Sequence, residues 1–204
     1  MPTTPSDLEM LRAEVAIAAA RMIAEDGSDY GTAKRKAARQ ILGEVKPGSD
    51  ILPDNAQIES EVRIYNELFF GESQPARLLH LRKLALKLME ELAQFAPHLT
   101  GAVLNGTAGE HSDIHLQLFS DSAKDVEIYL INKNINFKVS ETQHFNGRGA
   151  SIEMLSFMWQ NEGVHLALYE TVDLRGARRP ASAQRLERAN ADTVRQLIAD
   201  QNPS

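Results

Sequence analysis

Residues that could carry chemistry gather in positions 100–118, TGAVLNGTAGEHSDIHLQL. The first half of this segment is an apolar run that ends in a Gly-rich turn. Polar and apolar residues then alternate over residues 112–118, which predicts a half-buried strand with Asp113, His115 and Gln117 on one face. A carboxylate and an imidazole are both potential metal ligands. The segment therefore presents a flexible turn beside a polar strand face.

This segment resembles the active-site motif of the nucleotidyltransferase superfamily, the polymerase-beta-like enzymes. The stretch GAVLNGTAGEHSDIHL aligns without a gap with the family form GSxxxGTAxxxSDIDL, in which a Gly-Ser turn precedes Asp-x-Asp on a strand. Ala102 stands where Ser is usual, and His115 stands where the second metal-binding carboxylate is expected. An alternative alignment, with Gly106-Thr107 as the turn, leaves a shorter spacing to Asp113. The positions that match are Gly101, Gly106, Thr107, Ser112 and Asp113.

The resemblance implies a set of site residues in which the metal-binding carboxylates are incomplete. His165 joins the set because Val164 to Leu168 is similar to the family strand that carries a third carboxylate. The cofactors implied are Mg²⁺ or another divalent metal, and a nucleoside triphosphate. The catalytic residues implied are Asp113, His115 and His165, the metal ligands are Asp113 and His115, and the nucleotide-binding residues are Gly101, Ala102, Gly106, Thr107 and Ser112.

Two imidazoles in this set change its expected chemistry. Mg²⁺ prefers carboxylate oxygens and water, so Asp113 with His115 and His165 better suits Zn²⁺ or another transition ion. The two histidines could also be neighbouring polar side chains on an open sheet face, or part of a metal-free nucleotide site. Glu153 could replace one missing carboxylate if its side chain shares the face of His165.

Two basic clusters are candidates for phosphate binding. The first is a loop, Arg175-Gly-Ala-Arg178-Arg179-Pro180, in which Arg178 and Arg179 could clamp a triphosphate or an RNA backbone, because guanidinium binds phosphate oxygens in pairs. The second cluster consists of Lys34, Arg35, Lys36 and Arg39. For both clusters the alternative is a solvated surface that only favours solubility.

Periodicity and turn residues predict the elements that position these side chains. Together they predict an α+β fold, with an N-terminal helical segment packed on a small mixed β-sheet of nucleotidyltransferase type and a C-terminal helix. The domains expected are residues 1–73 and 74–204. Helices are expected at about residues 6–27, 32–42, 54–71, 74–95, 121–134 and from 182, a short strand at 137–139, and a hairpin of 151–159 and 164–170 around residues 161–163.

The composition is ordinary for a globular protein, with 204 residues, 43% hydrophobic and 25% charged. There are 28 acidic and 22 basic residues, and the net charge of -6 argues against generalised affinity for nucleic acids. The absence of cysteine excludes disulfides, thiolate metal sites and cysteine nucleophiles. The polar N-terminus lacks signal-peptide features and no apolar run could span a bilayer, so we expect a cytoplasmic protein without a membrane partner.

Two functions of different class fit these observations. The first is a nucleotidyltransferase-like enzyme that moves a nucleoside monophosphate from a triphosphate to a small molecule, an RNA or a protein acceptor. The second is a catalytically inactive relative that binds a nucleotide or a partner protein through the same face. Asp113 and the Gly-rich turn favour the first function, whereas Ala102, His115 and His165 favour the second.

Overall fold

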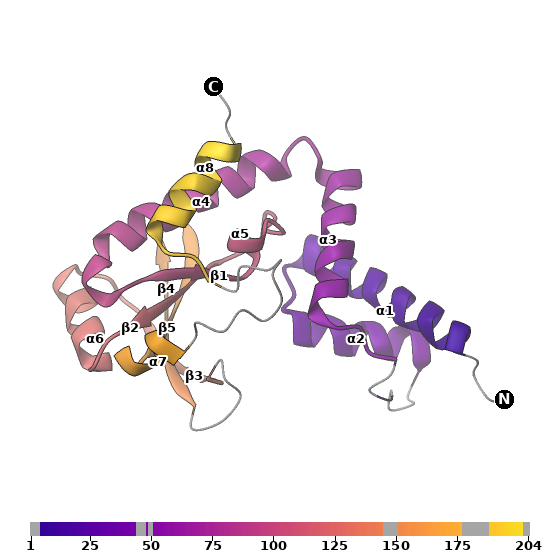
Figure 1. The fold of residues 1–204 in the computed structure, drawn as a ribbon, viewed down its shortest axis with the longest axis horizontal. Helices are drawn as coiled ribbons and strands as arrows, with labels where there is room; N and C mark the ends of the chain where they lie inside the picture. Colours follow the sequence, from indigo (N-terminus) through magenta and orange to yellow (C-terminus); the bar gives the residue numbers. More distant parts are fainter. Residues whose placement is uncertain (1–4, 44–47, 49–50, 145–150, 177–187, 202–204) are drawn as a thin grey trace. The chain divides into compact units, whose positions relative to one another are not determined.

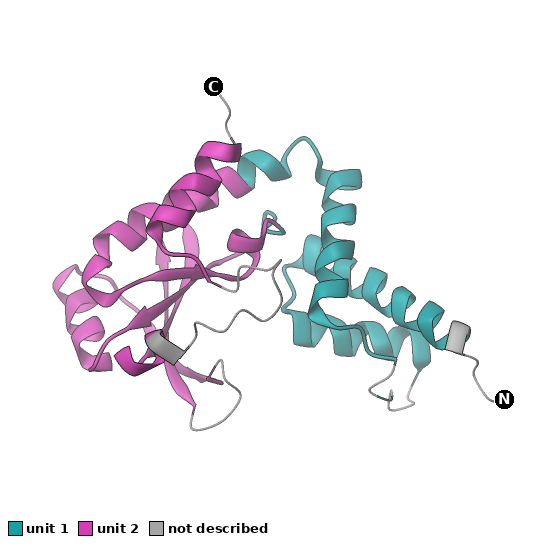
Figure 2. Ribbon diagram, in the orientation of Figure 1, with its two compact units in different colours: residues 1–77, 107–111 teal, residues 78–106, 112–204 magenta. Residues whose placement is uncertain are grey.

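The chain folds into an α+β structure, as the sequence predicts (Figure 1). This computed structural model describes residues 5–43, 48, 51–144, 151–176 and 188–201. Within them, a group of helices precedes the first strand of a five-stranded mixed sheet, two helices lie between strands along the chain, and two follow the last strand. Figure 2 shows two compact units, one of residues 1–77 with 107–111 and one of residues 78–106 with 112–204.

The first unit is helical and has a core of small side chains. Its helices are α1 (Pro5–Asp26), α2 (Tyr30–Leu42) and α3 (Asn55–Phe70). Asp29 caps α2 by accepting a hydrogen bond from the Thr32 backbone at 2.9 Å, and Asp54 caps α3 through the Gln57 backbone at 2.7 Å. Small side chains let helices approach closely. The buried core residues include Val15, Ala16, Ala19, Ala20, Ala33, Ala37, Ala38, Ile58 and Val62.

The second unit is built on the sheet, whose strand order is β1-β2-β5-β4-β3. Strands β2 and β5 pair in parallel, and the other neighbouring strands pair antiparallel. A parallel pair cannot be joined by a tight turn, so its two strands come from distant parts of the chain. The strands are β1 (His98–Thr100), β2 (Ile114–Phe119), β3 (Lys138–Thr142), β4 (Ile152–Trp159) and β5 (Glu162–Tyr169).

Alternation along the strands gives the sheet one apolar face and one face of mixed character that carries a row of polar residues. Leu99, Leu116, Leu166 and Leu155 are cross-strand partners in four neighbouring strands, and all four are buried. Successive side chains of a strand point to opposite faces, so the residues next to these leucines lie on the other face. That second face carries the polar residues described below.

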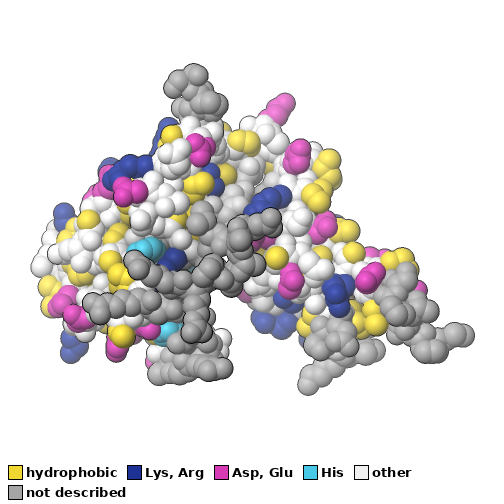
Figure 3. Space-filling model, viewed as in Figure 1, with side chains coloured by type: hydrophobic (Ala, Val, Ile, Leu, Met, Phe, Trp, Pro, Cys, Tyr) yellow, Lys and Arg dark blue, Asp and Glu magenta, His cyan; other side chains and the backbone are white. Residues whose placement is uncertain are grey.

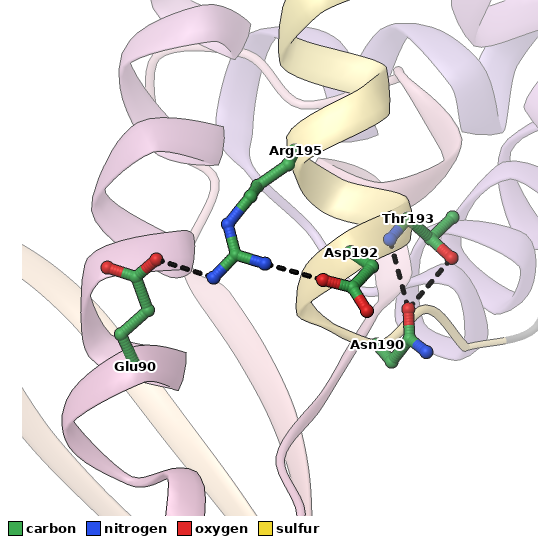
Figure 4. Close-up of polar contacts among 5 residues, drawn as sticks. All are labelled: Glu90, Asn190, Asp192, Thr193 and Arg195. Carbon is green, nitrogen blue, oxygen red and sulfur yellow. Dashed lines mark hydrogen bonds and ion pairs between the residues drawn. The ribbon is translucent and has the colours of Figure 1, made fainter.

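Helices complete the second unit. Figure 1 shows α4 and α8 lying side by side, and Figure 4 shows the polar contacts that join them. Arg195 of α8 lies 2.8 Å from Glu90 of α4 and 2.5 Å from Asp192. Asn190 accepts hydrogen bonds from the backbone and the hydroxyl of Thr193, which caps α8. The helices are α4 (Gln74–Glu91), the 3-10 helix η1 (Ala93–Phe95), α5 (Gly101–Asn105), α6 (Ala123–Asn132), α7 (Thr171–Gly176) and α8 (Ala191–Gln201).

Two turns differ from the sequence prediction. Strand β2 begins at Ile114, so Asp113 lies just before the strand and not within it. The β4–β5 turn is Gln160-Asn161, with φ of 49° and 67°, and residues 162 and 163 already belong to β5. A two-residue hairpin turn with two left-handed residues matches the twist of the strands, which moves the turn one residue earlier than predicted.

Two helix boundaries also differ. Ala189, which the apolar pattern places in the C-terminal helix, pairs with Leu99 through two backbone hydrogen bonds of 2.8 and 2.9 Å, and α8 starts only at Ala191. The predicted basic loop also begins differently, because Arg175 belongs to α7. Edge pairing with β1 therefore overrides the helical pattern of the sequence near residue 189.

Candidate functional site

A polar row crosses all five strands of the sheet. Thr100, His115, His165, Ser156 and Lys138 are successive cross-strand partners in β1, β2, β5, β4 and β3. Directly opposed residues share one face of a sheet, so these five side chains lie on the same side. His115 and Lys138 are exposed and the other three are partly exposed, which leaves the row accessible to solvent.

Both ring nitrogens of His165 are hydrogen-bonded, one to Asp113 and the other to Ser156. Nε2 of His165 lies 3.0 Å from Oδ2 of Asp113, and Nδ1 lies 2.8 Å from Oγ of Ser156. A carboxylate only accepts hydrogen bonds, so Nε2 donates to Asp113, and in the tautomer with its proton on Nε2 the Nδ1 atom accepts from the Ser156 hydroxyl. His165 is therefore positioned to act as a base toward the hydroxyl group of Ser156.

His115 stacks against His165, with ring centroids 4.7 Å apart and planes inclined by 23°. Loss of hydration among the surrounding protein atoms is the main cause that lowers the pKa of His115 to about 4, His165 lowers it further, and Asp113 opposes the shift. The side chain still meets solvent. With its pKa lowered, His115 is neutral near pH 7.

Gly163 makes room for the Asp113 carboxylate. A Cβ atom on Gly163 would lie 2.1 Å from Oδ1 of Asp113, far inside a van der Waals contact. The sequence contains no signal for this approach, because Asp113 and Gly163 are distant in the chain and meet only through the parallel pairing of β2 and β5. Gly163 and Ser156 are therefore two site residues that sequence reasoning missed.

The turn that follows β1 lies beside His115. Gly101 has φ of 69°, and a Cβ on it would lie 3.8 Å from Cβ of His115. Gly106, with φ of 88°, caps the other end of α5. The guanidinium of Arg82, which is 7% exposed, donates to the carbonyl groups of Val103 and Leu104 at 3.1 Å each.

Arg82 is a positioning residue that the sequence did not indicate. It also donates to Oε1 of Gln201 at 3.0 Å, so one side chain joins α4, α5 and α8. Loss of hydration lowers the pKa of its guanidinium below the usual range. Its hydrogen bonds are to carbonyl groups near the C-terminal end of the short helix α5. Arg82 therefore fixes the position of this helix, which begins at Gly101.

The structure gathers only part of the predicted site. Asp113, His115, His165 and Gly101 come together, and Ala102 follows Gly101 in α5. Thr107 belongs to the other unit, is 2% exposed and has its carbonyl group bound by Asn66, so a direct nucleotide contact by its side chain is not expected. Ser112 directly precedes Asp113, and Gly106 lies next to Arg82. Arg178 and Arg179 lie outside the described residues.

The alternative role for Glu153 is wrong. Glu153 and Ser156 are three residues apart in β4, and side chains alternate between the faces of a strand. Ser156 is the cross-strand partner of His165, so Glu153 points to the opposite face. It therefore supplies no carboxylate to the polar row.

The donor atoms of this site do not fit Mg²⁺. His165 uses both ring nitrogens on Asp113 and Ser156, which leaves one carboxylate and the neutral His115 to face a metal. A hard ion that prefers several oxygen ligands is poorly served by that pair. Among the residues that the structure describes, no group of three or more His, Cys, Asp or Glu side chains is arranged to hold a metal.

A separate cavity of about 460 Å³ lies where β2 and β5 end. Its walls include Asp121, Glu170 and Asp173, together with His144, whose Nε2 lies 3.1 Å from Oδ2 of Asp173. Three carboxylates repel phosphate groups, so this cavity is a poor candidate for the nucleotide site. The polar row remains the better candidate.

Comparison with known proteins adds no relative. No protein-family model matches the chain, and no curated protein matches it significantly. Among the described helices, none is both long and apolar enough to cross a bilayer. The resemblance to nucleotidyltransferases therefore still depends on the residues of the motif.

Proposed function

We propose that this chain is a nucleotidyltransferase-like protein that binds a nucleotide at the polar row without catalysing Mg²⁺-dependent transfer. One observation carries the proposal: the parallel pairing of β2 with β5 sets His115 and His165 side by side, next to the turn at Gly101. These are the positions that the family motif assigns to nucleotide and metal. This chain presents the corresponding face with imidazole nitrogens in place of two carboxylates.

The charges at this face support binding more than transfer. Asp113 is the only carboxylate that the motif retains, and it is bound to His165. Two imidazoles in place of carboxylates remove the repulsion that a nucleotide phosphate would otherwise meet without metal. They also remove the ligands needed for an ion that would neutralise a leaving diphosphate. The exposed His115 ring offers a stacking surface for a base.

A second candidate function follows from the contacts of His165. Because its Nδ1 accepts from the Ser156 hydroxyl while Asp113 holds Nε2, His165 is oriented as a general base. An acceptor hydroxyl that replaced the Ser156 hydroxyl at Nδ1 would give its proton to this base during transfer of a nucleoside monophosphate. In this second function the catalytic group is His165 and not a metal ion.

A binding and turnover experiment separates the two functions. Calorimetric titration with ATP and GTP, alone and with Mg²⁺, Mn²⁺ or Zn²⁺, should show binding that needs no metal. His115→Ala should weaken that binding about tenfold, whereas His80→Ala, which removes an exposed imidazole elsewhere in the same unit, should not.

The same samples test for transfer. We expect no release of diphosphate with Mg²⁺, and His115→Asp should raise the affinity for Mg²⁺ by adding a second carboxylate. Robust Mg²⁺-dependent transfer by the wild type, lost in Asp113→Ala, would overturn the binding proposal. Absence of nucleotide binding under every condition would overturn both functions.

A further inference from the structure

Helix α2 of the first unit has an unbalanced charge. Its thirteen residues include Lys34, Arg35, Lys36 and Arg39 and no acidic residue, in a chain whose net charge is -6. Its buried positions are alanines that pack into the core of the unit. Arg35, Lys36 and Arg39 therefore project into solvent from the opposite side of the helix.

These cations line a groove and do not simply spread over a convex surface. The groove has a volume of about 440 Å³ and is lined by Met22 of α1 and by Thr32, Arg35, Lys36, Arg39 and Gln40 of α2. None of these lining residues is acidic. Arg35 donates to the Thr32 hydroxyl at 3.1 Å, which orients its guanidinium along the helix. Arg35 and Arg39 are one turn apart, about 6 Å along the axis, so both can reach one phosphate.

Two carboxylates, Asp29 and Glu25, bear on the charge of this region. Asp29 accepts from the Thr32 backbone, and its hydrogen bonds with Thr32 are the main cause that lowers the pKa of this carboxyl group. Glu25 pairs with Arg21 at 3.4 Å and accepts from the Tyr65 hydroxyl. Arg35 also lowers the pKa of Asp29 through its charge, so this carboxylate offsets part of the positive charge. Arg35, Lys36 and Arg39 still give the groove a net positive charge at neutral pH.

We propose that this groove binds the sugar–phosphate backbone of a nucleic acid strand. Arg35 and Arg39 hold one phosphate between them, Lys36 attracts the next, and Met22 with the arginine stems gives an apolar floor for a sugar. The site lies in a different unit from the polar row, so it goes beyond the nucleotide-binding function proposed above.

An anionic membrane is the main competing partner, and the composition of α2 argues against it. A helix that lies on a bilayer inserts bulky apolar side chains from the face opposite its cations. The corresponding positions of α2 are alanines, and they are buried in the protein core. Phosphate recognition with a shallow apolar floor suits a polynucleotide better.

Fluorescence anisotropy with labelled RNA and DNA strands of about 20 nucleotides tests the proposal. Both strands should bind, since the shared phosphate is recognised, and affinity should fall steeply between about 50 and 200 mM salt. In the triple variant Arg35→Ala, Lys36→Ala, Arg39→Ala, affinity at low salt should fall at least about tenfold and the salt slope should drop by about 2. Alanine is the best helix former, so α2 should persist, which circular dichroism checks.

A charge-matched control separates a site from bulk electrostatics. Lys83→Ala, Lys124→Ala, Lys133→Ala removes the same charge from exposed positions of the other unit. We expect this control to bind like the wild type. Equal losses in both triple variants, no binding by the wild type at low salt, or binding to phosphatidylserine vesicles in place of nucleic acid would each overturn the proposal. Free nucleotide is absent throughout, so failure of the polar row to bind nucleotide leaves these outcomes unchanged.

Discussion

The hydrogen bond between Asp113 and His165 depends on a missing side chain. In Gly163→Ala the new Cβ would occupy the position of the Asp113 carboxylate, which must then rotate away from His165. We expect the variant to stay folded, because only the end of a side chain has to move. The Nε2–H resonance of His165 should lose its hydrogen-bonded shift in ¹⁵N-resolved NMR spectra. Gly48→Ala, whose Cβ meets no atom within 4 Å, should leave the resonance in place.

His115 should make the protein less stable in mild acid. Its folded pKa is lowered to about 4 from 6.5, so between these values the unfolded chain binds a proton that the folded chain does not. The free energy of unfolding therefore falls as pH drops through this window, and the loss is complete below about 4. Urea unfolding at neutral and mildly acidic pH should show a smaller decrease in His115→Gln than in the wild type. Equal decreases in both proteins would contradict this assignment.

Single residues of the site were predictable only where strand alternation determines them. The pattern from Ser112 to Leu118 indicates that Asp113 and His115 share a face, and the motif adds His165. Ser156 and Gly163 could not be found this way, because the register of β5 against β2 and β4 depends on packing of residues distant in the chain. Local patterns contain no information on that register.

Among the elements, α5 is held by one buried arginine. Arg82→Ala would leave the carbonyl groups of Val103 and Leu104 without their donor, and it would release Gln201 of α8. We expect a loss of about 3 kcal/mol in the free energy of unfolding, as for other buried charged hydrogen bonds. Chemical denaturation measures the loss. The adjacent Lys83→Ala, at an exposed position, should change stability by less than about 0.5 kcal/mol.

The helices and strands follow the sequence closely where periodicity is sustained. Helix α3 begins after the cap Asp54 and ends before Gly71, as capping residues indicate. Predictions fail where tertiary pairing competes with local preference, as at Ala189, whose backbone bonds to Leu99 and leaves the helical pattern. Pairing at the edge of a sheet satisfies backbone groups that an isolated helical turn would satisfy equally well, so the local pattern cannot decide.

At the scale of the whole molecule, the chain passes between its two units more than once. Residues 107–111 belong to the helical unit although both flanking segments belong to the sheet unit. The Asn66 amide donates to the carbonyl group of Thr107 at 3.2 Å, and Gln74 donates to that of Ala108 at 2.8 Å. The helical unit is therefore completed by a segment that no linear boundary includes.

Truncated chains test whether residues 107–111 stabilise the helical unit. A chain of residues 1–77 lacks the acceptors for Asn66 and Gln74, and a chain of residues 78–204 retains residues 107–111 without their neighbours. We expect both fragments to unfold at lower temperature than the full chain, because buried groups such as Thr107 and Ala108 become exposed. Calorimetry of the three proteins tests this. A fragment of residues 78–204 with the melting temperature of the full chain would show that the segment contributes little.

The parallel pairing of β2 and β5 also determines when the polar row can form during folding. Partners such as Ile114 and Val164 are far apart in the chain, whereas β4 and β5 are joined by the two-residue turn at Gln160-Asn161. Local hairpins close in microseconds, and pairings of high contact order come later because a long loop must be closed first. The β4–β5 hairpin should therefore place Ser156 beside His165 early. His115 and Asp113 would join them only when β2 docks, which makes the imidazole stack a marker of the last folding steps.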